Sequence, residues 1–301
     1  MNSVRSYLSL IKFSHTIFAM PFAFIGFTLG MIVLNKDYSY EQHGFLRMSD
    51  HFNFIVKFLL VLACMVTARS AAMAFNRYLD RQFDERNPRT AIREIPAGII
   101  TPKNALAFTI INCLLFITAT LFINPICFYL SPVALFVILF YSYTKRFTAL
   151  CHLVLGLGLS LAPIGAYLAL TGKFALLPIF FSLAVLFWVS GFDIIYALQD
   201  EEFDRNHQLH SIPAMLGKKN ALGVSEFLHF LSAAAVVGAG FYGNFGWLYW
   251  IGMAVFVGML IYQHSIVKPD DLRRVNLAFM TANGIASVVF ALFVIADLFI
   301  N

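Results

Sequence analysis

The sequence predicts an all-α, polytopic membrane protein with nine transmembrane helices in a bundle around a central cavity, forming one domain over residues 1–301. The first observation behind this fold class is composition: 60% of the residues are hydrophobic and only 12% are charged. Average usage is about 25% charged. The second is the spacing of the charges, which leaves long apolar runs, since a spanning helix needs roughly 20 mostly apolar residues. The third is an uneven distribution of Lys and Arg.

The charge-free runs place the first four helices. Residues 13–35 predict the first helix. Residues 58–68 carry no charge and the apolar pattern continues past Arg69 to Phe75, which predicts the second. Residues 104–144 form one long run that is interrupted at Asn124-Pro125. Proline breaks a helix and favours a turn, so this run predicts a tight hairpin of two helices.

The second half of the chain has the same layout. Residues 147–172 predict the fifth helix and residues 174–198 the sixth. A second long run, residues 227–267, is divided near Gly243-Asn244 and predicts the seventh and eighth. Residues 275–299 predict the ninth.

Lys and Arg orient these helices. With the N-terminus in the cytoplasm, 17 of the 21 basic residues lie on the inner face. Basic residues are in excess on the cytoplasmic side of membrane proteins, so we expect a multi-pass protein of the bacterial cytoplasmic (inner) membrane whose N-terminus and site face the cytoplasm. This topology accounts for the net charge of +5. We therefore expect membrane lipid around the protein, no nucleic-acid partner and no obligate protein partner.

The chain resembles two repeated units, one over about residues 13–144 and one over about residues 147–267, followed by the ninth helix. The acidic pair Asp80 and Asp84 recurs as Asp200 and Asp204, at an offset of 120 residues. Ile-Pro-Ala follows in each half at an offset of 117, and the long charge-free runs begin at an offset of 123. Each unit has an even number of helices, so both acidic pairs fall on the cytoplasmic side.

The first acidic motif contains Asn76, Asp80 and Asp84, spaced i, i+4, i+8. On a helix these side chains stack on one face, where the two carboxylates repel each other. Local arginines are one source of compensation, and a divalent ion is the other. Oxygen ligands suit Mg²⁺, which takes one or two carboxylates together with substrate phosphate.

The second acidic motif contains Asp200 and Asp204, with Tyr196 one turn earlier. Asp193 lies deeper in apolar sequence, and an intramembrane acid is a functional candidate. Two facing acidic pairs would hold a polyanion through metal, most naturally a diphosphate. Arg69, Lys145 and Arg146 are placed to grip its oxygens. The sequence lacks the P-loop pattern, which argues against ATP or GTP.

Three further features border these motifs. The loop from Asn87 to Arg93 follows the first motif, and His207 and His210 follow the second, so these segments are candidate lids. His152 sits near apolar sequence and is interpreted as a satisfied interfacial histidine.

At these residues the chain resembles the UbiA superfamily of intramembrane prenyltransferases. The family motif NDxxDxxxD stands here as Asn76-Arg77-x-x-Asp80-x-x-x-Asp84, and the second motif, DxxxD, as Asp200 to Asp204. Arg69, the Arg89-Thr90-x-x-Arg93 segment and the Tyr143 to Thr148 segment also match. The resemblance extends over essentially the whole chain.

The resemblance implies a nine-helix bundle in which Mg²⁺ and a prenyl diphosphate are bound at the two motifs, with the prenyl chain in an apolar tunnel open to lipid. It assigns Mg²⁺ binding to Asn76, Asp80, Asp84, Asp200 and Asp204. It places Arg69, Asn76, Tyr143, Lys145, Arg146 and Tyr196 at the prenyl diphosphate and the aromatic acceptor. Arg146 would also stabilise the leaving charge, and Asp193 and Asp200 are the two candidates for the base that removes the ring proton.

One residue departs from the family pattern: Arg77 stands where the family has Asp, so the first site is less acidic. Residues 69–77 and 191–193 resemble 4-hydroxybenzoate polyprenyltransferases and their relatives in menaquinone pathways. We therefore expect transfer of a polyprenyl chain to 4-hydroxybenzoate in quinone biosynthesis. A menaquinone precursor, haem or chlorophyllide are alternative acceptors. A secondary transporter is the alternative from another class, since transporters also have repeats and buried charges; a purely structural membrane protein would have no reason to keep two costly Asp pairs.

Overall fold

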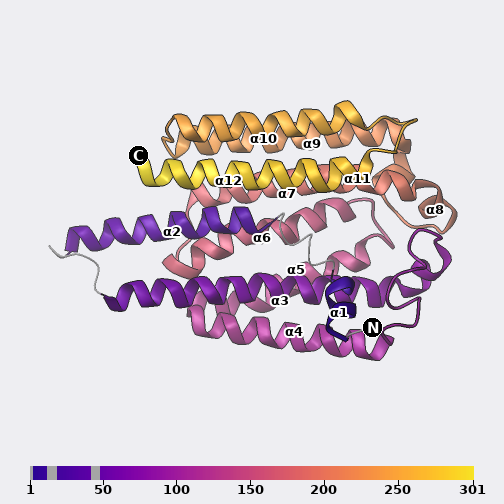
Figure 1. Cartoon of the computed structure of the whole chain (residues 1–301), viewed down its shortest axis with the longest axis horizontal. Coiled ribbons are helices and arrows are strands. Elements are labelled where there is room, and N and C mark those ends of the chain that lie inside the picture. The colour runs from indigo at the N-terminus through magenta and orange to yellow at the C-terminus, as the bar shows by residue number, and fades with distance from the viewer. Residues whose placement is uncertain (1–2, 12–18, 42–47) are drawn as a thin grey trace.

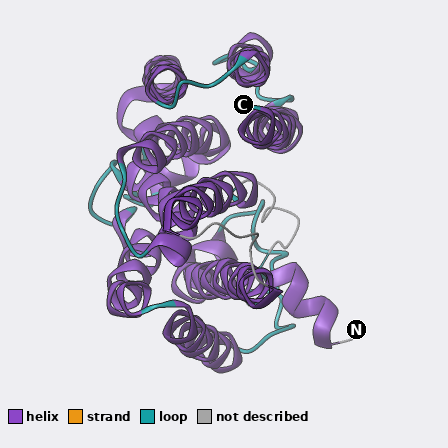
Figure 2. Cartoon of the chain, turned by 90° about the vertical axis from the view of Figure 1, so that its left-hand side faces the viewer, coloured by secondary structure: helices purple, strands orange, loops and turns teal. Residues whose placement is uncertain are grey.

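The computed structural model describes residues 3–11, 19–41 and 48–301. Nine long helices in these ranges run roughly along one direction, as Figure 1 shows and as the end-on view of Figure 2 repeats. They are α2 (Met20–Glu41), α3 (Met48–Arg86), α4 (Pro102–Ile123), α5 (Pro125–Thr144), α6 (Cys151–Thr171), α7 (Leu176–Ala197), α9 (Ile212–Tyr242), α10 (Trp247–Ile266) and α12 (Asn283–Ile300).

Shorter elements lie at the helix ends. These are α1 (Ser3–Leu10), a 3₁₀ turn (Leu198–Asp200), α8 (Glu201–Asn206), α11 (Val275–Leu277) and a π-helical turn (Ala278–Ala282). In Figure 1, α8 and the connection from α3 to α4 lie at the same end of the bundle, on the right. This end carries both acidic motifs, so the topology brings the two halves of the predicted site together.

Eight of the described helices are long and apolar enough to cross a membrane. The protein is therefore an integral, multi-pass membrane protein. The one remaining expected span is the first, at residues 13–35. It corresponds to α2, whose apolar part covers the shorter segment Met20–Asn35. Residues 13–18, where this span was expected to begin, lie outside the described residues. The division of the chain into two repeated units stays a prediction.

The hairpin at Asn124-Pro125 is confirmed, and Asn124 explains it. Its side-chain oxygen accepts a hydrogen bond from the backbone amide of Cys127 at 2.9 Å, which caps the start of α5. Its amide nitrogen donates to the backbone carbonyl of Leu168 at 2.8 Å. One side chain thus begins α5 and joins the hairpin to the C-terminal part of α6.

Two helices are longer than the charge-free runs predict. Helix α3 continues to Arg86, so the first acidic motif lies within the helix rather than after it. Helix α9 begins at Ile212, fifteen residues before the run at 227. Charge-free runs mark the part of a helix that lies in hydrocarbon, whereas a helix can extend beyond it wherever its charged side chains reach water or a polar cavity.

The second acidic motif does not lie on one straight helix. Helix α7 ends at Ala197, the 3₁₀ turn contains Asp200, and α8 contains Asp204. The i, i+4 spacing therefore spans a change of helix type. The carboxylates of Asp200 and Asp204 consequently face different partners.

The largest buried side chains pack between α2, α7, α10 and α12, and they are mainly aromatic. Phe22 lies 5.4 Å from Trp188 and 5.8 Å from Phe290, measured between ring centroids. The indole of Trp188 donates to Oδ1 of Asn283 at 2.8 Å. Asn283 in turn donates to the carbonyl of Phe279, at 3.0 Å, in the π-helical turn. This core holds α7, and with it Asp193 and Tyr196, in a fixed position.

Candidate active site

A polar cavity of about 510 Å³ lies at the end of the bundle that carries α8. Residues of α3, of the loop after it, of α6, of α7 and of α8 line this cavity. Ten of the eleven predicted site residues are among them: Arg69, Asn76, Asp80, Asp84, Lys145, Arg146, Asp193, Tyr196, Asp200 and Asp204. Segments that are more than 100 residues apart in the sequence thus form one site.

The eleventh predicted residue, Tyr143, lies outside this lining, and its assignment to the substrate site stays a prediction. Its side chain is 41% exposed. Its ring packs 5.8 Å from the ring of Phe75, measured between centroids, and it faces the guanidinium of Arg146. Tyr143 lies on the last turn of α5, beside Arg146 of the cavity lining.

The first acidic motif presents one face of α3 to the cavity, as its spacing predicts. The amide of Asn76 donates to Oδ2 of Asp80 at 3.0 Å, and the guanidinium of Arg146 donates to Oδ1 of the same carboxylate at 3.2 Å. Asp84 is buried, and Nη1 of Arg93 donates to its Oδ1 at 2.6 Å. Arg77, which stands where the family pattern has Asp, also contacts Asp84: its Nη1 lies 4.0 Å from Oδ2 of that carboxylate.

The second acidic motif is paired with cations in the same way. Nε of Arg89 donates to Oδ1 of Asp200 at 2.9 Å, while its Nη2 pairs with Oδ2, so the contact is bidentate. Asn87 donates to the same carboxylate at 3.1 Å. A third guanidinium nitrogen of Arg89 donates to the hydroxyl of Tyr196 at 3.1 Å. The loop after α3 therefore contacts the second motif directly, and its interpretation as a lid stays a prediction.

Asp204 is fully buried and pairs with Lys145, whose Nζ lies 2.7 Å from Oδ1. Ser211 donates to the second oxygen at 2.9 Å. Burial alone would lower the pKa of Lys145, but the Asp204 carboxylate outweighs burial and raises it above its usual value. Asp200 likewise raises the pKa of Arg89, against the opposing effect of burial. Both cations therefore stay charged at neutral pH.

Sequence reasoning missed the role of His152. It was interpreted as a satisfied interfacial histidine, but it is buried in the cavity wall with Nδ1 2.6 Å from Oδ2 of Asp193. Arg89 and Arg93 were named only as members of a candidate lid. The sequence signal for the two arginines is their position one short loop beyond the first motif, whereas no local pattern links His152 to an Asp 41 residues away.

The charges in the lining are balanced, yet several donors are unused. Six basic side chains and six acidic ones line the cavity. Among the described residues, the Nε atoms of Arg69, Arg77 and Arg146 are buried without a hydrogen-bond acceptor. An unused buried donor costs about 1–3 kcal/mol. These guanidinium groups therefore favour an anionic ligand in the cavity.

The donor chemistry fits Mg²⁺ that is completed by a ligand. Within the described residues, no group of three or more His, Cys, Asp and Glu side chains could hold a metal ion by itself. Mg²⁺ does not need such a group, because it usually takes one or two carboxylates together with waters and substrate phosphate. Asp80 with Asn76, and Asp200 on the opposite wall, are oxygen donors of this kind.

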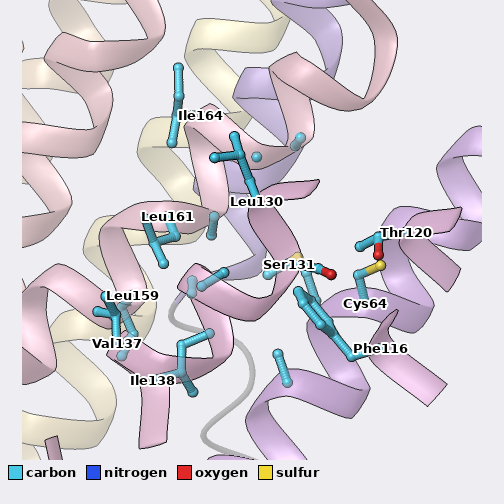
Figure 3. A pocket seen from close by; sticks show the side chains of 18 of the residues that line it. Cys64, Phe116, Thr120, Leu130, Ser131, Val137, Ile138, Leu159, Leu161 and Ile164 are labelled. Atoms are coloured by element: carbon cyan, nitrogen blue, oxygen red, sulfur yellow. The ribbon is translucent and has the colours of Figure 1, made fainter. Parts of the chain in front are cut away.

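An apolar cavity of about 390 Å³ adjoins the polar one (Figure 3). Helices α3, α4, α5 and α6 supply its walls, with side chains such as Val137, Leu161 and Ile164. Five residues line both cavities: Arg69, Met73, Tyr141, Leu155 and Leu159. A ligand with a charged head and a long apolar tail would fill the two cavities together.

Comparison with known proteins agrees with this geometry. The model of the UbiA prenyltransferase family matches residues 44–285. The chain belongs to this family. The family confirms the resemblance found in the sequence and favours an enzyme over a transporter or a structural membrane protein.

Named UbiA-family relatives share much of this chain. A 4-hydroxybenzoate octaprenyltransferase of Nitrosospira multiformis is 31% identical, over 77% of this chain and 80% of its own length. A protein of the same name from Methylococcus capsulatus is 30% identical, over 75% of this chain and 77% of its own length.

Solved UbiA structures have the same fold. The apo structure of a UbiA homolog from Aeropyrum pernix K1 has a TM-score of 0.76 and 27% identity, covering 95% of this chain and 97% of its own. A UbiA homolog from Archaeoglobus fulgidus bound to DMAPP and Mg²⁺ has a TM-score of 0.69, covering 98% of this chain and 100% of its own. Its identity is 19%, so it supports the fold alone.

Proposed function

We propose that this UbiA-family protein transfers a polyprenyl chain from its diphosphate to 4-hydroxybenzoate, with Mg²⁺, in the biosynthesis of a ubiquinone- or menaquinone-type quinone. The observation that carries this proposal is the meeting of the two cavities. One is lined by six cations and six acids, the other is apolar, and five residues belong to both. A prenyl diphosphate has the matching head and tail, and the named relatives carry 4-hydroxybenzoate in their names.

The polar cavity would hold the diphosphate. Asn76, Asp80, Asp84, Asp200 and Asp204 would hold Mg²⁺, which supplies Lewis-acid neutralisation of the charge on the leaving diphosphate. Arg69, Lys145 and Arg146 would bind diphosphate oxygens directly and stabilise the charge that builds up there. Arg89 and Arg93, which pair with Asp200 and Asp84, would add positive charge beside the diphosphate.

Breaking the C1–O bond leaves its electron pair on the diphosphate and an allylic cation at C1. An electron-rich carbon of the aromatic ring forms the new C–C bond, and the ring then loses its proton to a base. Where the polar cavity meets the apolar one, the lining includes the apolar side chains of Leu155 and Leu159, and Phe192 also lines the polar cavity. Water must be kept away, since it would trap the cation. The loop that carries Arg89 contacts Asp200 and Tyr196 in the wall of the polar cavity.

The protein would act at the cytoplasmic face of a bacterial inner membrane. The excess of Lys and Arg at the end of the bundle that carries the site supports this orientation. Lipid surrounds the bundle, and the tail of a long prenyl chain would extend from the apolar cavity into it.

The direct test uses the purified protein in lipid vesicles with Mg²⁺, a polyprenyl diphosphate and 4-hydroxybenzoate, with product identified by mass. We expect 3-polyprenyl-4-hydroxybenzoate and one diphosphate released per product. Parallel reactions contain a bicyclic aromatic acid of the menaquinone type, haem or chlorophyllide. If only one of these compounds is prenylated, it is the acceptor in place of 4-hydroxybenzoate. Absence of any prenylated product would contradict the proposal that the protein is a prenyltransferase.

A further inference from the structure

The pair formed by His152 and Asp193 lies outside the metal and diphosphate contacts described above. His152 is the second residue of α6, and Asp193 lies near the end of α7. The imidazole Nδ1 lies 2.6 Å from Oδ2 of Asp193. The histidine side chain is 3% exposed, whereas that of Asp193 is 24% exposed. The pair therefore has a buried member and a member that faces the cavity.

The contact made by the other ring nitrogen, Nε2, indicates which nitrogen of His152 carries the proton. The backbone amide of Ile212, the first residue of α9, donates to Nε2 of His152 at 3.3 Å. An amide N–H needs an acceptor, so this contact assigns the proton of the ring to Nδ1. The Nδ1–H of His152 then donates to the Asp193 carboxylate.

The backbone holds the ring in this orientation. The hydroxyl of Ser190, on α7, donates to the carbonyl of His152 at 3.1 Å. The amide of His210, just before α9, donates to the carbonyl of Lys145 at 2.7 Å. The start of α6 is thus tied to α7, and the loop after α5 is tied to the segment before α9. Within the described residues, Oδ1 of Asp193 has no hydrogen-bond partner, whereas Oδ2 is held by His152.

We propose that His152 is a positioning residue, which orients Asp193 so that its Oδ1 atom receives the aromatic ring proton. This inference rests on the proposed function. The carboxylate takes the proton, the C–H electron pair returns to the ring, and Asp193 then returns the proton to water or to the released diphosphate. His152 keeps its own proton throughout and acts by holding Oδ2.

The rival base, Asp200, is less suitable on two counts. Arg89 and Asn87 already donate three hydrogen bonds to its carboxylate. It also lies seven residues further along the chain, which is about 10 Å at a helical rise of 1.5 Å per residue. Asp193 is therefore nearer the interior, where Leu155 and Leu159 line both cavities. The first carbon of a prenyl chain must sit at that junction, with diphosphate on one side and the tail on the other.

The test compares two amide variants of His152 with 4-hydroxybenzoate that carries deuterium on the ring carbons to be prenylated. In His152→Asn the amide nitrogen replaces Nδ1 and still donates to Asp193. In His152→Gln the amide lies further out, near the place of Nε2, and does not. We expect His152→Gln to lower kcat by about 10-fold or more and to show a primary deuterium isotope effect on kcat. KM for the prenyl diphosphate should stay the same. His152→Asn should retain most of kcat and show no isotope effect.

Two carboxylate variants keep the test decisive if a His152 variant fails to fold. Asp193→Asn is nearly isosteric and should show the largest loss of kcat with an isotope effect. Asp200→Asn should raise the Mg²⁺ requirement and the KM for the prenyl diphosphate, and it should show no isotope effect. Equal losses in both His152 variants without an isotope effect would overturn the inference, since they would indicate a structural tie between α6 and α7. Wild-type kcat in Asp193→Asn would also overturn it. A wild-type protein that prenylates no aromatic acid would instead refute the proposed function.

Discussion

Nζ of Lys145, in the loop after α5, lies 2.7 Å from Oδ1 of Asp204 in α8, and this ion pair joins the two halves of the chain at the cavity wall. The carboxylate is 1% exposed and the lysine 34%. Removing the lysine would leave a buried acid with only Ser211 as its partner. The pair is therefore a structural element as well as a candidate diphosphate contact.

We predict that Lys145→Met lowers the free energy of unfolding by about 1–2 kcal/mol. This figure is lower than for fully buried pairs because the lysine is partly exposed to solvent. The raised pKa of Lys145 fixes the pH dependence. The stabilisation is complete below the pKa of an exposed lysine and is lost as pH rises through the higher folded value. Thermal unfolding in detergent at neutral and alkaline pH measures both, with Lys145→Arg as the control that keeps the charge.

The second prediction concerns Mg²⁺. Chelation of divalent ions should abolish prenyl transfer. Asp80→Asn should raise the Mg²⁺ concentration that gives half the maximal rate by about 10-fold or more, because losing a metal ligand, or a group that supports one, weakens metal binding by about that factor. Asp271→Asn is the matched control. Asp271 is an acid outside the cavity lining that pairs with Arg273 in the loop after α10. Equal Mg²⁺ dependence in both variants would show that Asp80 takes no part in metal binding.

Arg89 leads to a third prediction, because it joins the loop after α3 to both Asp200 and Tyr196. We expect Arg89→Gln to lower kcat/KM for the prenyl diphosphate by about 10- to 100-fold, the loss expected for a charge-assisted contact. The loop should also close less tightly, so more of the allylic cation reacts with water. The ratio of free prenyl alcohol to transfer product measures this leak.

Arg205→Gln is the control for Arg89. Arg205 also pairs with an acid of this region, Glu201, but its side chain is 59% exposed and it lies outside the cavity lining. A similar rise in prenyl alcohol in Arg205→Gln would assign the leak to general loosening of α8.

Much of the site was predictable because its residues follow local rules. Asn76, Asp80 and Asp84 share a face because one helix carries them, and the hairpin at Asn124 follows from capping and proline. The repeated acidic motif was enough to bring both halves to one cavity. These inferences needed only spacing along one helix and the number of membrane crossings.

The rest depends on contacts between distant segments. Arg89 turns back onto a carboxylate 111 residues away, and His152 meets Asp193 across two helices. Spacing along the chain contains no information about which loop side chain reaches which wall. Tyr143 lies outside the cavity lining for a similar reason: its place two residues before Lys145 does not determine which side chains of α5 line the cavity.

The last prediction uses two glycines of α6 to test the apolar cavity as the site of the prenyl chain. Both Gly158 and Gly165 line it. A Cβ atom added at Gly165 would have nothing within 4 Å, and one at Gly158 would only meet Ile138 at 3.9 Å. Larger side chains would therefore extend into open space. The two positions are seven residues apart, or about 10 Å along the helix, and Gly158 is nearer the polar cavity.

We expect Gly165→Phe to keep transfer from a short prenyl diphosphate, such as geranyl diphosphate, and to lose about 10-fold or more with an octaprenyl diphosphate. Gly158→Phe should impair both, since it blocks the tail near its first carbon. Gly223→Phe is the control, because that glycine is in α9, lines neither cavity and also has open space around it. Rates with the two donors give the comparison. Unchanged donor preference in Gly165→Phe would mean that the chain takes another path, since an aromatic ring at that position must obstruct a tail that runs along α6.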